Sequence, residues 1–364
     1  MDIATTLENV NALKAEEQAR RVARRHARIN KAAKFLNIVG LGWITPILKM
    51  ATGEDIKTQS KELWLLLGVP VLAIGLFLLA WGQIAPTVKT SLGTIPGPSQ
   101  VWEQAVSLYD DHVRERAREA AFFERQEKRN AAKLAKNTDA KIKVRQYTGP
   151  PTYFDQILTS ISTVFLGFVI GSLIAVPLGV MCGLSPTVSA ALTPLIQIFK
   201  PVSPLAWLPL VTMVVSAVFV SEDPLFEKSF LTSAITVTLC SLWPTLINTA
   251  VGVGSIDKDL MNVGRVLRLK WGTTLTKLVL PSSLPFIFTG LRLSLGVGWM
   301  VLIAAEMLAQ NPGLGKFVWD EFQNGSSQSL AKIMVAVFTI GIIGFVLDRL
   351  MSALQALFTY GDVR

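Results

Sequence analysis

Long apolar runs alternate with shorter polar segments through most of this 364-residue chain. Six of these runs approach or exceed the roughly 20 residues that a helix needs to cross a bilayer. They lie at about 63–85, 157–182, 188–220, 230–253, 286–309 and 331–358. Asp348 and Arg349 interrupt the last one. The pattern predicts an all-α, polytopic membrane protein with about six transmembrane helices.

The third run differs from the others because it is too long for one straight crossing. It contains KPVSPLAWLP, with prolines at Pro201, Pro204 and Pro209. Proline removes a backbone donor and kinks or breaks a helix, so we predict a discontinuous element here. Inside a membrane, such backbone is tolerated only where it packs on protein or lines a cavity.

Polar segments precede and separate the spans. In 1–62, a basic run precedes about fourteen mostly apolar residues, which predicts a cytosolic interfacial helix or a helix packed on a partner subunit. Segment 86–156 is rich in Ala, Glu, Lys and Arg, and its insertion at 109–148 predicts one or two solvated helices. The core of five spans occupies 157–358, and 359–364 form a tail.

Composition excludes an ordinary soluble domain. Hydrophobic residues make up 51% of the chain and charged residues 17%, whereas soluble domains carry about 25% charged residues. Cys182 and Cys240 both lie in apolar runs, which argues against a disulfide framework. No metal-ligand cluster is visible, and the net charge of +9 is explained by membrane orientation rather than by nucleic acid.

The loop charges predict an orientation. If 1–62 are cytosolic, six crossings place the loop 255–285 and the C-terminus in the cytosol as well. That loop carries five basic and two acidic residues, whereas the short loops predicted to lie outside, at 221–228 and 310–330, are acidic. The positive-inside rule therefore favours a membrane protein with both termini inside.

The loop 255–285 has the sequence SIDKDLMNVGRVLRLKWGTTLTKLVLPSSLP. Its apolar positions Leu260, Val263, Gly264 and Leu267 recur at i, i+3, i+4 and i+7, which predicts an amphipathic helix. We expect Gly264 to leave a gap that a partner's side chain could approach. The alternative is a surface helix that lies on its own bundle.

This loop resembles the cytosolic signature of type I ABC importer permeases of the nitrate, sulfonate, taurine and bicarbonate branch. Val279, Leu280 and Pro281 match the ending of that signature. Asn262-Val263-Gly264 replaces its Glu-Ala-Ala, and Arg268 stands where the family has Gly. The resemblance is greatest to nitrate permeases. It extends to KPVSPLAWLPL at 200–210, LPFIFTGLRLSLGVGWMVLIAAEML at 284–308 and IPGPSQVWEQ at 95–104, and covers about 86–108 and 155–358.

The resemblance implies a MetI-like core whose loop helix docks on a separate cytosolic ATPase. The residues expected to couple the two are Leu260, Asn262, Val263, Gly264, Arg265, Leu267 and Arg268. The family further implies a periplasmic solute-binding protein and a homodimer of this permease in the membrane lipid. ATP and Mg would be bound by the partner, because the chain has no G-x-x-x-x-G-K-[ST] loop and is not expected to be an enzyme.

The implied cargo is a small anion, with nitrate or nitrite first and bicarbonate, cyanate, taurine or another sulfonate as alternatives. Two other classes remain open. A secondary transporter would need gates of its own and usually paired repeats, none of which the sequence shows. A membrane scaffold would carry its function in the soluble segments.

Polar residues inside the predicted spans are candidates for the substrate path. They are Trp207, Thr236, Thr238, Ser241, Thr245, Asn248, Arg292 and Glu306. The hydroxyl and amide groups could equally form interhelical hydrogen bonds. Trp207 could pack rather than gate, Arg292 could snorkel to the interface, and Glu306 could contact another helix in a structural role.

Overall fold

The computed structural model describes residues 42–51, 56–90, 93–136, 144–219 and 226–359, together with 33, 36 and 40. The basic run expected before the interfacial helix, and nearly all of the tail 359–364, lie outside the described residues. The chain divides into two compact units, Met1–Ala80 with Ser352–Arg364 and Trp81–Met351, and each is described by itself.

The first unit contains short helices followed by the start of the first span. Helix α2 covers Ile44–Met50 and α3 covers Ile56–Leu63, and the π-helical turn Trp64–Gly68 leads into α4, Val69–Ile84. Together Ile56–Thr87 form the first candidate membrane span. Apolar side chains such as Leu65, Ile74 and Leu79 are exposed all along it, as expected for a helix surrounded by lipid.

In the part of the second unit that the structure describes, the regular elements are helices and one two-stranded hairpin, β1 (Lys89–Thr90) with β2 (Gly93–Thr94). Its helices are α5 (Pro98–Lys136), α6 (Tyr153–Leu184), α7 (Pro186–Phe199), α8 (Pro204–Val218), α9 (Lys228–Gly254), α10 (Lys258–Val266), α11 (Trp271–Thr274), α12 (Leu280–Ala309), α13 (Leu314–Asn324) and α14 (Ser327–Thr359). A π-helical turn, Leu275–Val279, joins α11 to α12. The predicted all-α membrane fold is confirmed.

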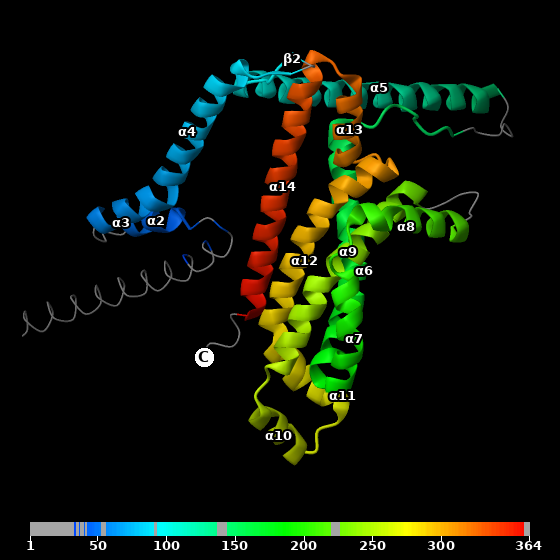
Figure 1. Cartoon of the computed structure of the whole chain (residues 1–364). Coiled ribbons are helices and arrows are strands. Elements are labelled where there is room, and N and C mark those ends of the chain that lie inside the picture. Colours follow the sequence, from blue (N-terminus) through cyan, green and yellow to red (C-terminus); the bar gives the residue numbers. More distant parts are fainter. Residues whose placement is uncertain are drawn as a thin grey trace, which may run out of the picture. The chain divides into compact units, whose positions relative to one another are not determined.

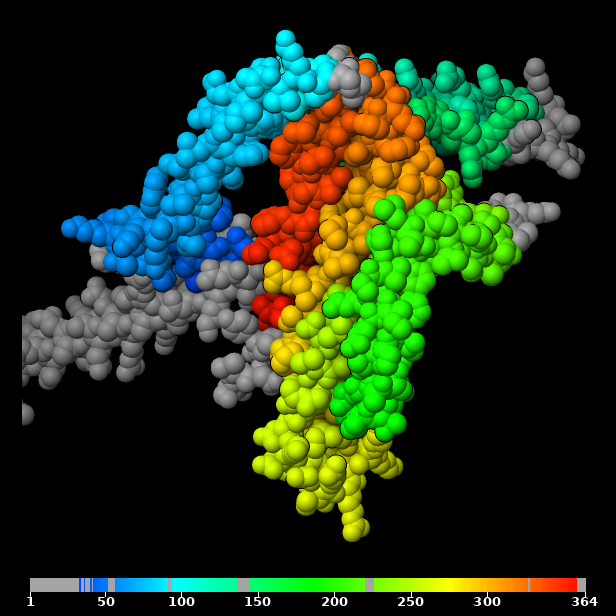
Figure 2. All heavy atoms as spheres, viewed as in Figure 1, coloured from blue at the N-terminus to red at the C-terminus, as the bar shows by residue number. Residues whose placement is uncertain are grey.

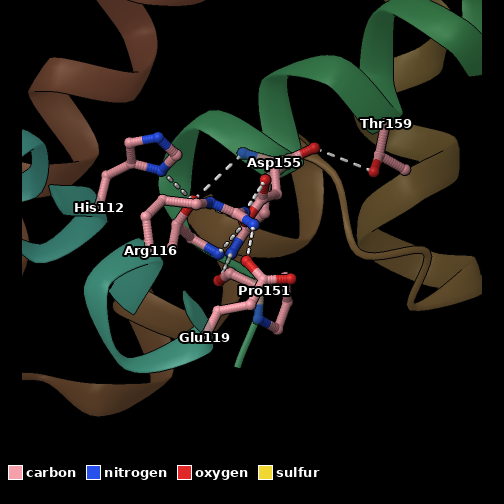
Figure 3. A network of polar contacts seen from close by, with 8 residues as sticks. His112, Arg116, Glu119, Pro151, Asp155 and Thr159 are labelled. Carbon is pink, nitrogen blue, oxygen red and sulfur yellow. Dashed lines mark hydrogen bonds and ion pairs between the residues drawn. The ribbon is translucent and has the colours of Figure 1, made fainter. Parts of the chain in front are cut away.

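The charged segment forms one long helix, α5, which is fastened to the start of α6. Thr152 caps α6 by accepting from the Asp155 backbone N–H, and the Asp155 carboxylate accepts from Thr152 in return. Figure 3 shows Arg116 of α5 reaching both Glu119 and Asp155, while the His112 ring lies 2.7 Å from the Thr152 hydroxyl. Two turns of α5 are thereby tied to the capping box of α6.

Helices α6 and α9 pack closely because α6 carries a small residue at every fourth position. These residues are Gly167, Gly171, Ala175, Gly179 and Gly183. A Cβ on Gly167 would lie 2.6 Å from the Ala234 carbonyl oxygen, and one on Gly183 would lie 2.5 Å from the Val253 Cβ. Small residues at this spacing let two membrane helices approach backbone to backbone.

The same contacts fix the direction of the chain. Early residues of α6 meet early residues of α9, and late ones meet late ones, so the two helices run parallel. The chain between Leu184 and Lys228 must therefore return across the full thickness of the bundle. The pair α7 and α8, bent by 101°, makes this return. The predicted break in the third apolar run is confirmed, and if the bent pair is counted as one span, the five other candidates bring the number to six.

The last spans alternate in direction. Helix α12 runs antiparallel to α9, because Gly290 packs on Thr245 and Gly298 on Val237. Helix α14 runs antiparallel to α12, because Trp299 Nε1 donates to the Ile340 carbonyl oxygen at 3.0 Å while the earlier Arg292 bonds to the later Asp348. Figure 1 shows the consequence, with α10 and α11 at one end of the bundle and α13 with the start of α14 at the other.

Candidate functional site

Helix α10 has defined boundaries on both sides. The Asp257 carboxylate caps its start by accepting from the Asp259 backbone N–H at 2.9 Å. At its end, Leu269 N–H donates to the Gly264 carbonyl at 3.1 Å and Arg268 N–H to the Arg265 carbonyl at 3.0 Å. These two bonds form a Schellman motif, which ends the helix and turns the chain sharply.

The Schellman motif explains why the family pattern has glycine at position 268, where this chain has arginine. Arg268 has φ 48°, in the left-handed region that favours glycine. The glycine that the resemblance places at this position would adopt this conformation without strain. Arginine adopts it here at a cost of about 1 kcal/mol.

The inner face of α10 packs on the chain's own loop, which corrects one expectation. Gly264 is buried, and a Cβ placed on it would lie 2.9 Å from Leu278 Cδ1. The gap expected for a partner is therefore occupied by Leu278 of the same chain. Below it, Met261 packs against the cluster of Val180, Val253 and Val279, which joins the loop to α6 and α9.

The outer face of α10 and the turn after it present four exposed apolar side chains. We call them the coupling tip: Val263 (51% exposed), Val266 (81%), Leu267 (64%) and Trp271 (73%). Asn262, Arg265 and Arg268 are exposed beside them. Figure 2 shows this yellow segment projecting at one end of the bundle.

The exposed apolar face is thus rotated from the one predicted. Val263 and Leu267 lie on it as expected, but Leu260 is half-buried and Gly264 is buried. The sequence analysis missed Val266 and Trp271. Both could have been found from the apolar residues of VLRLKW at 266–271. This apolar pattern continues beyond the end of α10.

The polar face of α9 is used inside the bundle. Thr236, Thr238, Ser241 and Thr245 are all buried. The Thr238 hydroxyl donates to the Gly167 carbonyl of α6 at 3.0 Å, and Thr245 lies 2.7 Å from the Ser294 hydroxyl of α12. Asn248 donates to the Pro244 carbonyl at 2.8 Å. Thr238 and Thr245 therefore hold α9 to α6 and α12, whereas the Asn248 bond and that of Thr236 to the Thr232 carbonyl stay within α9.

Arg292 has a carboxylate partner that the sequence analysis did not assign. Its Nε donates to Asp348 Oδ1 at 2.6 Å and its terminal nitrogen donates to Oδ2 at 2.8 Å. This bidentate pair joins α12 to α14, and Arg349 approaches the same carboxylate at 3.5 Å. The Arg292 guanidinium is therefore already paired with the Asp348 carboxylate, in the bidentate geometry that gives the strongest hydrogen bonds between these two groups.

Glu306 lies inside the protein and is 0% exposed. Its carboxyl oxygens accept from the Ser160 hydroxyl at 2.8 Å and from the Gly315 backbone N–H at 3.0 Å. Because Gly315 is in the first turn of α13, the carboxyl group stabilises that helix start. Glu306 therefore acts as the structural residue that the sequence analysis offered as one alternative. Its fully buried carboxyl group is not accessible to a substrate.

Trp207 and a groove beside it complete the candidate residues. The Trp207 ring packs on Phe199 with centroids 5.7 Å apart, across the bend between α7 and α8. Beside this bend, a groove of about 310 Å³ is lined by α7, by Cys182 of α6 and by residues of α9. Its polar lining comes from one face of α7, at Ser189, Thr193, Gln197 and Lys200. Sequence reasoning missed this face, although the spacing of four, four and three residues is helical.

Comparison with known proteins identifies the core. The family of binding-protein-dependent transport system inner membrane components matches residues 175–359, which include α7 through α14. The nitrate import permease protein NrtB of Synechococcus elongatus is 34% identical over 197 residues, which cover 54% of this chain and 67% of that protein. The bicarbonate transport system permease protein CmpB of the same organism is 37% identical over 203 residues, which cover 56% and 68%. A chain of the inward-facing MetNI methionine ABC transporter is 14% identical with a TM-score of 0.48, covering 57% of this chain and 96% of that one.

Proposed function

Because this chain belongs to the family of binding-protein-dependent transport system inner membrane components, we propose that it carries a small oxyanion, nitrate or bicarbonate, across the membrane. It is a non-catalytic subunit of an ABC importer. The ATP that drives it, with Mg, is bound by separate ATPase subunits, and a solute-binding protein delivers the anion. Two copies of the permease form the translocation unit.

The coupling tip is the observation that carries the docking part of this proposal. Val266, Leu267 and Trp271 are exposed apolar side chains at one end of the molecule, where water contact is unfavourable. Arg265 and Arg268 flank them and would meet acidic groups on the rim of an ATPase cleft. This end carries the basic loop, so the tip and both termini are assigned to the cytosol.

The packing of α10 suggests how docking moves the spans. Gly264 seats the helix on Leu278, and Met261 packs into the cluster that includes Val180 of α6 and Val253 of α9. A displacement of the tip is therefore passed to two spans through side-chain contacts rather than through a flexible loop. The π-helical turn Leu275–Val279 connects the same loop to α12.

The two relatives support a small oxyanion as cargo, and we propose nitrate first because the resemblance of the sequence is greatest to nitrate permeases, with bicarbonate as the alternative. Both named proteins carry planar, singly charged oxyanions, so this chain is proposed to recognise that shared chemistry. Uptake of labelled nitrate into proteoliposomes that contain the permease, the ATPase and the binding protein tests the assignment. If bicarbonate, but not nitrate, is accumulated, the cargo is bicarbonate. If neither is accumulated, the proposal is wrong.

The docking proposal is tested with Leu267→Asp and a matched control, Phe322→Asp. Both side chains are apolar and exposed, at 64% and 57%, but Phe322 lies on α13 at the opposite end. Losing the burial of Leu267 and adding an unpaired carboxylate should together cost about 3 kcal/mol, or about 100-fold in affinity. Leu267→Asp should therefore lose the ATPase on co-purification while Phe322→Asp retains it. Equal retention by the two variants would contradict docking at the tip.

A further inference from the structure

We propose that Lys200 is the cation in this permease that contacts the transported anion during its passage. The inference rests on the proposed function, because it names the residue that meets the oxyanion. It replaces Arg292, the membrane cation that the sequence first suggested. It is carried by the groove beside α7 and by the different surroundings of the cations within the spans.

The cations that lie away from the ends of the spans fall into two groups: those that pair with a carboxylate and those that do not. Arg292 makes two hydrogen bonds to Asp348, and Arg349 lies 3.5 Å from the same carboxylate. Among the described residues, no carboxylate lies within ion-pair distance of Lys200. A positive charge at membrane depth is costly unless a counter-charge or water accompanies it. A mobile anion would provide that counter-charge.

The position of Lys200 suits a path through the bundle. It directly follows α7, whose 14 residues rise about 21 Å from the end of α6 at Ser185. That places the Lys200 backbone well inside the span, at the 101° bend between α7 and α8. Broken helices in transporters are tolerated where the backbone lines a cavity, and substrate sites form at such breaks.

The groove supplies further donors on the same helical face. Lys200 and Gln197 line the groove one turn apart. Thr193 and Ser189 line it one and two turns before Gln197, toward the start of α7. The Thr193 hydroxyl already donates to the Ser189 carbonyl at 2.7 Å, so the ammonium and the Gln197 amide are the better donors to an anion. The opposite wall is apolar, formed by Leu246, Ile247 and Val251 of α9. A single positive charge with few hydrogen-bond donors, facing an apolar wall, would bind a small, singly charged oxyanion weakly enough for it to be released.

The first test measures nitrate uptake in the reconstituted importer with Lys200→Arg, Lys200→Gln and the matched control Lys228→Gln. Lys228 begins α9 and does not line the groove. Loss of one charge-assisted hydrogen bond should lower uptake by Lys200→Gln at least about tenfold at low nitrate. Lys200→Arg should keep most uptake, and Lys228→Gln should equal wild type. Wild-type-like uptake by Lys200→Gln would overturn the inference while leaving the proposed function intact, and absent uptake of both nitrate and bicarbonate by wild type would refute the proposed function itself.

The second test does not depend on transport, so a folding defect cannot imitate its result. The purified wild-type permease is treated with an amine-reactive reagent, and modification of Lys200 and Lys228 is followed by mass spectrometry. Sodium nitrate should slow modification of Lys200 relative to Lys228, compared with sodium gluconate at the same ionic strength. Equal protection of both lysines would show only general screening. Protection by phosphatidylglycerol vesicles but not by nitrate would assign Lys200 to a lipid headgroup. Either result would overturn the inference.

Discussion

Replacement of Glu306 by alanine should strongly destabilise the end of the bundle that carries α13. In the structure, the Ser160 hydroxyl and the Gly315 backbone N–H both donate to this carboxyl group. Ser160 also accepts from the Leu314 N–H at 2.8 Å, so the four residues form one connected network. Each buried donor left without an acceptor costs about 1–3 kcal/mol. Two such donors predict a loss of about 2–6 kcal/mol, before any cavity is counted.

The assay is unfolding of the purified permease by SDS in mixed micelles, followed by tryptophan fluorescence. The matched control is Asp320→Ala, which removes a carboxylate of α13 that pairs with Lys316 at 2.6 Å on the surface. Such an i,i+4 pair contributes about 0.3–0.5 kcal/mol. Glu306→Gln, which keeps one acceptor oxygen, should fall between the two. If Glu306→Ala loses no more stability than Asp320→Ala, the network is not what holds α13.

A double-mutant cycle separates this network from simple loss of volume. If the hydrogen bond is part of the cause, Ser160→Ala should cost less in the Glu306→Ala background than alone, because only its bond from the Leu314 N–H is then left to lose. The coupling energy between the two positions should then be about 1 kcal/mol or more. Additive losses would mean that the two residues contribute independently, which the geometry does not allow.

Three further changes test other parts of the fold. Arg292→Asp should lower expression and stability, and adding Asp348→Arg should restore most of the loss, whereas failure of this charge exchange to rescue would contradict the ion pair. Gly179→Leu should separate α6 from α9 and abolish folded protein, because a Cβ at this position would already lie 2.6 Å from another side chain. Gly296→Leu serves as the control, since nothing lies within 4 Å of its Cβ position. Arg268→Gly should raise stability by up to about 1 kcal/mol by relieving the left-handed backbone at that residue, and a loss of stability in SDS unfolding would show that the Arg268 side chain makes a larger contribution.

Much of the fold could be predicted because the membrane restricts the choices. A run of about 20 apolar residues has few fates other than a spanning helix, and prolines at 201, 204 and 209 leave few ways to continue one. The sequence analysis therefore located the six crossings and the broken third span. It did not use the small residues of α6, although their spacing at Gly167, Gly171, Gly179 and Gly183 marks the face that meets α9.

The orientation of α10 could not be predicted from its own residues. An apolar stripe shows that one face avoids water, but the same stripe can meet a partner or the protein's own chain. Here Gly264 and Met261 pack inward because Leu278 and Val279 return beside them in the loop. That leaves Val266, Leu267 and Trp271 outward, a division that depends on contacts between residues more than ten positions apart.

The charged residues within the spans illustrate the same limit and carry the argument further. Sequence shows that Glu306, Arg292 and Lys200 each lie in an apolar context where a bare charge is costly. Only the fold shows how the cost is offset. Glu306 receives hydrogen bonds from α6 and α13, and Arg292 receives a carboxylate from α14. The groove residues around Lys200 offer an amide and hydroxyl groups but no opposite charge. In the proposed carrier of oxyanions, Lys200 stands at the bend of a broken helix, and no carboxylate of the described residues pairs with it. A passing oxyanion would therefore gain most from binding there.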